Sequence, residues 1–382
     1  MQLYRRGHTG PAVAEIRFRL ALLGHLPGSA ATTSPRSYDE ECERAVRAFQ
    51  QDRGLSADGI VGPETYRALD EARWRLGDRV LFHAVSHPFA GDDVADLQQR
   101  LLDMGFDLGR CDGVFGTTTD AALREFQRNV GVHPDGLCGP ATLRALTRLQ
   151  RTVRGGHPQW MREAERLHRA GPALAGKVLV VDPGHGGPDR GAFSHGLEES
   201  KLVEDVAGRL EGRLAATGVA VYLTRGVDTN PSNAERASFA NTVGADLVLS
   251  LHVDRCPSPH AKGLSTYYYG WREPGRGGGG SAVGERLATL VQSELVARTG
   301  LEDCRSHPKT WELLRRTRMP AVRIELGYVS SPQDAVRLAD PSFRDVAAEA
   351  ILVAVQRLYL PPELDAPTGE LHLPGLAERV SS

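Results

Sequence analysis

The chain has 382 residues, of which 41% are hydrophobic and 25% charged, so it can form two or three folded domains of ordinary composition. A formal net charge of −2 argues against general binding to nucleic acid or an anionic membrane. The five cysteines include no Cys-x-x-Cys pair, which argues against a disulfide framework and a thiolate zinc site. No segment has the length of a transmembrane helix, and no apolar signal segment precedes Glu15, so we expect a cytoplasmic protein.

One sequence unit occurs twice in the first 150 residues. Phe49-Gln50, Asp58-Gly59, Gly62-Pro63 and Thr65 recur 77 positions later as Phe126-Gln127, Asp135-Gly136, Gly139-Pro140 and Thr142. Apolar residues at helical spacing, separated by Asp-Gly and Gly-Pro turns, predict three short helices in each copy. We assign the copies to residues 1–75 and 80–150. Most of the repeated Phe, Leu and Gly residues are expected to be core and turn positions, which leaves polar residues near the turns as the candidates for contact with a glycan or peptide.

The second copy contains Asp112-Gly-Val-Phe-Gly116 and resembles the three-helix peptidoglycan-binding domain of many cell-wall hydrolases. The first copy departs from this pattern. Pro35-Arg-Ser-Tyr-Asp39 stands where the family has its Asp-Gly turn, and extra residues in 28–34 are expected to form a loop. The resemblance therefore implies a degenerate first copy and a second copy able to bind peptidoglycan.

A basic linker, residues 151–175, leads to a region in which apolar runs of strand length alternate with helical patterns. Strands are expected at 178–181, 219–223, 247–251, 263–269 and 321–326, and helices at 201–216, 234–243, 282–299 and 343–358. This alternation predicts an α/β domain over 176–360, with a mixed, mostly parallel sheet flanked by helices, after two small three-helix all-α domains. The glycine-rich residues 271–280 are expected to be a loop that rims a cleft, and 361–382 a tail.

His185 lies in a glycine-rich turn, Asp182-Pro-Gly-His-Gly-Gly187, after the first apolar run. Such a turn suits a metal ligand, and it is equally typical of a simple bend. His252 follows the run 247–251, Glu199 begins the helix after the turn, and Glu325 interrupts the last apolar strand. Because sheets of this kind bind ligands beyond the carboxyl ends of their strands, these side chains are expected to converge. Two imidazoles and a carboxylate form a typical catalytic zinc site, and Glu325 is the candidate general acid and base.

The same residues carry a second resemblance. The His185 turn, Gly196-Leu-Glu-Glu199, Ser250-Leu-His-Val-Asp254 and Pro320-Ala-Val-Arg-Ile-Glu-Leu-Gly-Tyr328 resemble four blocks of the zinc-dependent N-acetylmuramoyl-L-alanine amidases. That family cleaves the amide between muramic acid and L-alanine. The resemblance implies that His185, Glu199 and His252 bind Zn²⁺ and that Glu325 is catalytic.

Some positions depart from the amidase pattern or give a weaker signal. Ser200 stands where the family usually has Lys, and Val253 and Arg255 replace small residues, which is expected to change the surroundings of the ligands and narrow the cleft. Residues Thr224, Arg225, Asp228 and Arg236 resemble substrate-side segments of the family, and a solvated ion-paired face explains them equally well. Arg305 and Arg315 stay outside the predicted site, and His195 and His260 are expected to be loop histidines.

Two functions follow from this sequence. The first is an amidase that hydrolyses peptidoglycan or muropeptides and is held on its substrate by the repeats. The second is an intracellular regulator or scaffold of precursor synthesis, with weak or no turnover, because the domain order resembles that of actinobacterial amidase-like proteins. In that role Thr368, three residues before Leu371, fits a phosphothreonine-reading partner. Cell-wall synthesis enzymes are then further partners, at the inner face of the membrane. The first function would require that the protein be exported by a route that uses no signal peptide.

Overall fold

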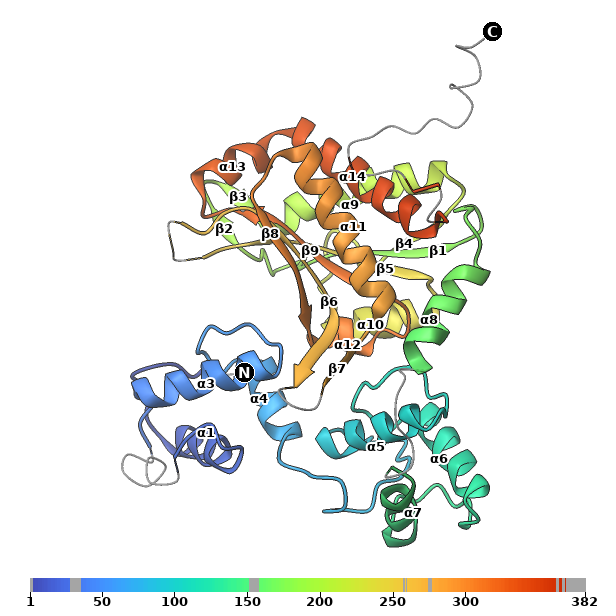
Figure 1. The fold of residues 1–382 in the computed structure, drawn as a ribbon. Coiled ribbons are helices and arrows are strands. Elements are labelled where there is room, and N and C mark those ends of the chain that lie inside the picture. Colours follow the sequence, from blue (N-terminus) through green and yellow to red (C-terminus); the bar gives the residue numbers. More distant parts are fainter. Residues whose placement is uncertain are drawn as a thin grey trace. The chain divides into compact units, whose positions relative to one another are not determined.

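The computed structural model describes residues 3–27, 36–150, 158–256, 258, 260–273, 277–361, 364, 365 and 368. The chain forms two compact units (Figure 1). Unit 1 comprises residues 1–162, 270–279 and 309–318, and unit 2 comprises residues 163–269, 280–308 and 319–382. Within the described ranges, no helix combines the length and the apolar character that a membrane span requires. The expected loop at 28–34, most of the tail and Leu371 lie outside the described residues.

Each repeat consists of three helices around its own apolar core, so the fold class predicted for this region is confirmed. The helices of the first copy are α1 (Pro11–Leu22), α3 (Glu40–Asp52) and α4 (Pro63–Glu71), and those of the second are α5 (Asp92–Asp103), α6 (Thr117–Asn129) and α7 (Pro140–Gln150). Proline begins α4 and α7, where its missing N–H costs nothing because the first helical amides have no partner within the helix. Separate apolar clusters, centred on Phe49 and Phe126, form the two cores.

The repeated polar residues form a buried hydrogen-bond network. In the second copy, the Gln127 amide donates to Asp135 Oδ1 at 2.8 Å and to Thr142 Oγ1 at 3.0 Å. Its oxygen accepts from the Gly136 amide at 2.9 Å. Gln127 is fully buried, so these bonds satisfy polar groups that would otherwise be costly. These polar residues of the motif therefore stabilise the turn between the helices.

The same network recurs around Gln50 and Gln98, which donate to Asp58 and Asp112 at 2.8 Å. In the first copy the position equivalent to Gln98 is occupied by Arg17, which is only 1% exposed. Its Nη1 donates to Asp39 Oδ1 at 2.7 Å, and Asp39 also accepts from the amide of Cys42 at the start of α3. An ion pair therefore replaces the Asp-Gly turn that the first copy lacks.

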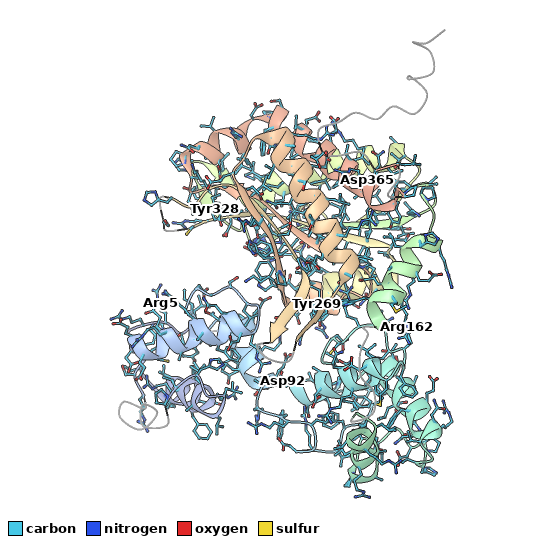
Figure 2. All side chains as sticks on the ribbon, viewed as in Figure 1. Arg5, Asp92, Arg162, Tyr269, Tyr328 and Asp365 are labelled. Carbon is cyan, nitrogen blue, oxygen red and sulfur yellow. The ribbon has the colours of Figure 1, made fainter. Side chains whose placement is uncertain are left out.

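Unit 1 also contains residues from late in the chain, Lys309–Arg318. Here Arg315 donates to both carboxylate oxygens of Glu71, at 3.0 and 3.2 Å. Trp311 packs against the apolar core of the first repeat. Each compact unit is therefore made of segments that are not consecutive in the chain. Figure 2 shows the side chains, with Arg5 and Asp92 of unit 1 labelled.

The long strands form a sheet in the order β4-β1-β5-β9-β6-β7, with β8 also paired to β6. Strands β4, β1, β5 and β9 run parallel to one another, and β6 is antiparallel to β9, which confirms the predicted mixed, mostly parallel sheet. The strands are β1 (Val178–Pro183), β4 (Ala220–Leu223), β5 (Leu247–Asp254), β6 (Leu264–Glu273), β7 (Gly277–Gly280), β8 (Asp303–Lys309) and β9 (Ala321–Tyr328). A short hairpin, β2 (Phe193–Ser194) and β3 (Leu197–Glu198), precedes the first long helix of unit 2.

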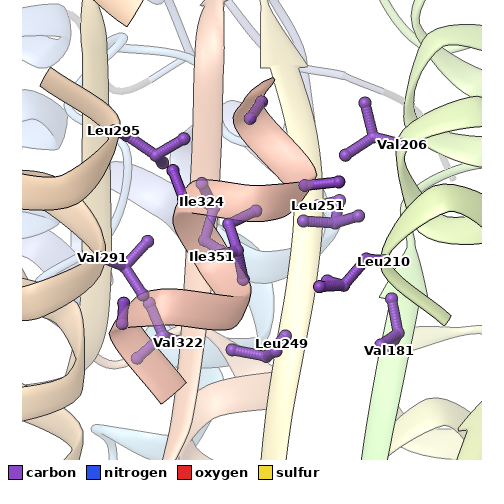
Figure 3. Close-up of a cluster of buried hydrophobic side chains, with 14 of the residues drawn as sticks. Val181, Val206, Leu210, Leu249, Leu251, Val291, Leu295, Val322, Ile324 and Ile351 are labelled. Atoms are coloured by element: carbon purple, nitrogen blue, oxygen red, sulfur yellow. The ribbon is translucent and has the colours of Figure 1, made fainter. Parts of the chain in front are cut away.

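Alternation along the strands gives the sheet one apolar face and one partly polar face. Leu249, Leu251 and Ile324 belong to the large core that long helices cover (Figure 3). These helices are α9 (Glu199–Ala216), α11 (Ala282–Thr299) and α14 (Pro341–Tyr359), and the remaining helices are α8 (Pro158–Arg169), α10 (Asn233–Thr242), α12 (Glu312–Arg316) and α13 (Pro332–Ala339). The intervening residues of β5 and β9, which include His252 and Glu325, point away from this core.

Two strand predictions need correction. The prediction of a loop over 271–280 is wrong, because β6 continues to Glu273 and Gly277–Gly280 form β7. The prediction that β5 ends before His252 is also wrong, since this strand runs to Asp254. Glycines weaken the sequence signal for a strand, but pairing with a neighbouring strand supplies the order that their own propensity lacks.

Candidate metal centre

Three side chains from separate elements meet at the carboxyl ends of the parallel strands. His185 lies in the turn after β1, Glu199 is the first residue of α9, and His252 lies in β5. One ligand atom from each lies within 4.8 Å of the other two. Glu199 joins the two rings, because its Oε2 is 3.2 Å from His185 Nε2 and its Oε1 is 2.9 Å from His252 Nδ1. The three ligand candidates are thus brought together.

The donor set and its protonation fit a divalent metal ion such as zinc. Two imidazole nitrogens and one carboxylate are a common catalytic zinc set, and the close spacing of their atoms leaves them able to share one ion. Burial opposes ionisation of Glu199, but hydrogen bonds from His185 and His252 outweigh it and hold the pKa of this carboxyl well below its usual range. Burial lowers the pKa of His252 to about 4, so this ring is neutral and has a lone pair at neutral pH.

Asp189 orients the exposed side of the centre. Its Oδ2 lies 2.8 Å from His185 Nδ1 and accepts a hydrogen bond from the amide of Asn230 at 3.3 Å. Since a carboxylate only accepts, Nδ1 of His185 donates to Asp189 and Nε2 faces Glu199, where a bound metal ion would replace the proton on Nε2. The sequence analysis did not include Asp189, although an acid four residues after a candidate ligand histidine was a usable signal.

A buried ion pair holds the turn that carries His185. Arg236 is 3% exposed and donates to Asp182 Oδ1 at 2.6 Å and to the carbonyl of His185 at 2.8 Å. Arg225 is also buried and donates to the carbonyls of Pro183 and Ser200. Neither interpretation offered from sequence, substrate contact or a solvated face, fits these two arginines. They fix the backbone beneath the ligands, whereas Asp228 is exposed.

Glu325 lies beside the three ligand candidates on the polar face of the sheet. It is paired with His252 across the β5–β9 ladder and is 4% exposed. Burial raises the pKa of Glu325 to about 7, although the guanidinium of Arg323 acts in the opposite direction. A carboxyl group that titrates near neutral pH can both accept and donate a proton, which is the property of a general acid and base.

Comparison with known proteins gives the family. The sequence profile of the N-acetylmuramoyl-L-alanine amidases matches residues 179–357, and that of a peptidoglycan-binding domain matches residues 9–69 and 90–146. The N-acetylmuramoyl-L-alanine amidase CwlM of Mycobacterium tuberculosis is 47% identical over 375 residues, which cover 96% of this chain and 91% of that protein. The chain belongs to the N-acetylmuramoyl-L-alanine amidase family.

More distant relatives match the amidase region alone. The amidase LytC of Bacillus subtilis is 33% identical over 178 residues, which cover 47% of this chain and 34% of LytC. The solved structure of the amidase AmiC2 of Nostoc punctiforme has 29% identity and a TM-score of 0.43, and the match covers 47% of this chain and 96% of that one. The family profile and the similarity to CwlM confirm the amidase domain expected from the sequence.

The positions that depart from the family pattern lie in different surroundings. Val253 points into the apolar core and is 1% exposed, so the expectation that it narrows a cleft is wrong. Its backbone amide instead donates to Glu199 Oε1 at 3.1 Å. Ser200 is buried at the start of α9, and Arg255 is exposed.

The remaining sequence candidates lie apart from the three ligand candidates. His195 contacts the carbonyl of Val329 at 2.9 Å from the hairpin before α9, and His260 is exposed. Arg315 belongs to unit 1, where it pairs with Glu71, and Arg305 is exposed in β8. None of these four residues belongs to the group of three.

Proposed function

We propose that this chain hydrolyses the amide bond between the muramic acid lactyl group and L-alanine in peptidoglycan or muropeptides, with zinc held by His185, Glu199 and His252. The observation that carries the proposal is the meeting of these three side chains beside the buried carboxyl of Glu325. A zinc ion there supplies a Lewis acid that polarises the scissile carbonyl and lowers the pKa of water.

The residues of the chain have separate parts in this proposal. Glu325 takes a proton from the attacking water as its oxygen bonds to the carbonyl carbon, and gives a proton to the amide nitrogen as the C–N bond breaks. Asp189 keeps the ring of His185 oriented, and Arg236 holds the backbone carbonyl of the same residue. The repeats raise the local concentration of the amidase on its substrate.

The experiment combines metal analysis with hydrolysis of a defined muropeptide. Purified chain is expected to hold about one zinc per molecule, as one three-ligand site requires. It should release the L-alanine-terminated stem peptide, and Glu325→Gln should keep the zinc and lose the activity. Glu349→Gln, a change at an exposed glutamate on α14, is the matched control and should behave as the wild type. A zinc-loaded wild type that releases no stem peptide contradicts the proposal.

We also propose that Thr368 is a phosphorylation site read by a forkhead-associated domain, which would place the chain with cell-wall synthesis partners. Support comes from the Leu that follows three residues later and from the contacts of Thr368 itself. Its hydroxyl accepts from Arg357 at 2.6 Å, and Arg357 also pairs with Glu294 and with Asp365, which is labelled in Figure 2. A phosphate at Thr368 would be attracted by the guanidinium of Arg357 and repelled by these two carboxylates, so phosphorylation would change the contacts of this part of the tail.

The test is calorimetric binding of a purified forkhead-associated domain to chain treated with a Thr kinase. Treated wild type should bind, Thr368→Ala should not, and Thr289→Ala, at an exposed helical threonine, should bind as the wild type does. Equal binding by treated Thr368→Ala overturns this site. The cytoplasmic location stays a prediction, which cell fractionation tests.

A further inference from the structure

Arg323 lies on the same face of β9 as Glu325 and was not among the residues singled out from the sequence. The alternation of β9 puts Val322 and Ile324 in the apolar core, so Arg323 and Glu325 both point to the polar face. In the sheet, Arg323 is paired with Ser250 of β5 and Tyr267 of β6. Its side chain is 29% exposed, whereas that of Glu325 is 5% exposed.

The two oxygens of Glu325 have different surroundings. Nε of Arg323 donates to Oε1 at 2.8 Å, and Nη2 lies 2.7 Å from the same oxygen. Oε2 is buried and has no hydrogen-bond partner among the residues that the structure describes. A buried carboxylate oxygen without a donor is costly, so an orphan of this kind in the centre of a sheet face needs an explanation.

We infer that Arg323 is a positioning residue, which fixes Glu325 through Oε1 so that Oε2 is the oxygen that exchanges protons with the substrate. The inference rests on the proposed amidase function. Oε2 takes the proton of the attacking water and returns a proton to the leaving amide nitrogen, while Oε1 keeps its bonds to Arg323 throughout. The orphan oxygen then has its partner in the reacting molecules.

The strength of this contact follows from its geometry. A glutamate side chain has three rotatable bonds, and a carboxylate that rotates freely spends little time in the orientation that proton transfer needs. The charge-assisted hydrogen bond from Nε and the ion-pair contact from Nη2, both to Oε1, restrict that rotation. Since Arg323 and Glu325 are two positions apart on one strand, the backbone keeps their Cα atoms at a constant separation and both side chains on the same face.

The test uses Arg323→Met and Arg323→Lys in the full chain with zinc bound. Met should reduce kcat by about tenfold or more, the scale of misplaced catalytic groups, while KM and zinc content change little. Lys keeps one charged donor and should recover part of the loss. In the Glu325→Gln background, Arg323→Met should change the residual rate less than twofold, because Arg323 acts through the carboxylate.

Crystal structures of wild type and Arg323→Met give a second readout that does not depend on activity. Glu325 should keep one orientation in the wild type and adopt another in the Met variant. An unchanged Glu325 orientation overturns the inference, as does an equal fall in rate in both backgrounds. If the zinc-loaded wild type hydrolyses no substrate, the proposed function is contradicted. In that case the orientation of Glu325 in the two crystal structures still tests whether Arg323 positions it.

Discussion

At the scale of single residues, Gly184 shows how closely the backbone approaches the ligand candidates. A Cβ atom added at this position would overlap the ring of His252. Gly191 is similar, since its Cβ would lie 2.5 Å from Glu199 Oε2 and 2.7 Å from His185 Cδ2. Gly184 and Gly191 are therefore required by the space that the three side chains occupy, which the sequence could indicate only as a turn rich in glycine.

We expect Gly184→Ala to fold and to lose zinc affinity, because the added methyl group displaces the ring of His252. The loss should be about tenfold or more, the scale found when the surroundings of metal ligands are disturbed. Competition with a chromophoric chelator measures it. Gly208→Ala, in α9, where the added Cβ meets no atom within 4 Å, is the matched control and should bind zinc as the wild type does. Unchanged affinity in Gly184→Ala contradicts the close approach.

Glu325 gives a pH dependence of stability. Its pKa is raised by burial to about 7, so the folded protein binds this proton more tightly than the unfolded chain does. The stabilisation is complete below the unfolded pKa and is lost as the pH rises through 7. In metal-free protein, the free energy of unfolding of Glu325→Gln relative to that of wild type should therefore increase by up to about 3 kcal/mol as the pH rises from 4.5 to 8. Urea unfolding at both pH values measures this, and a constant difference would contradict the raised pKa.

At the scale of elements, the glutamine networks connect the helices of each repeat to the turns between them. Gln127→Ala removes the bonds to Asp135 and Thr142 and leaves the amide of Gly136 without its partner. We expect the free energy of unfolding to fall by about 2–4 kcal/mol, as measured by denaturant unfolding of the second repeat. Gln51→Ala, at an exposed position of α3, should change stability by less than about 0.5 kcal/mol. A similar small effect at Gln127 would show that the network contributes little.

The sequence predicted those elements whose own residues carry the pattern. Apolar runs such as residues 178–181 and helical spacing around Phe126 identified the main strands and the repeat helices. β8 was missed because Asp303–Lys309 contains no apolar alternation, and only its pairing with β6 makes it a strand. The ligand candidates could be named because each follows or begins a predicted strand or helix and lies in a sequence block that resembles the amidase family. Asp189 was missed although its spacing from His185 was a usable signal, whereas the role of Arg323 depends on atoms that meet only after folding.

At the scale of the whole molecule, the chain contributes Lys309–Arg318 to the unit that contains the repeats. Residues 176–360 alone would keep this segment and lack Glu71, the partner of Arg315, together with the core against which Trp311 packs. An amidase domain separated from the repeats at the linker would thus lose the packing partners of residues 309–318 as well as the tether to substrate.

We expect the shortened chain, residues 176–360, to be cleaved by trypsin between Lys309 and Arg318 faster than the full chain, because open segments are the preferred sites of proteolysis. Mass spectrometry of the early fragments measures this. Cleavage after Arg213, which lies on α9 of unit 2 and pairs with Asp345, should be equally slow in both and is the internal control. Equal rates within the segment would show that the repeats do not protect it.

The bridging carboxylate of Glu199 has a consequence for how an ion enters and leaves the centre. Because Glu199 already holds both imidazoles at 3.2 and 2.9 Å, the conformational entropy of gathering the ligands is spent during folding. Arrival of a cation then exchanges hydrogen bonds for coordination without ordering any new segment, unlike a zinc finger, which is unfolded without its metal. Removal of the ion by a chelator should therefore leave a folded and reloadable protein, so that metal supply can switch the centre on and off reversibly.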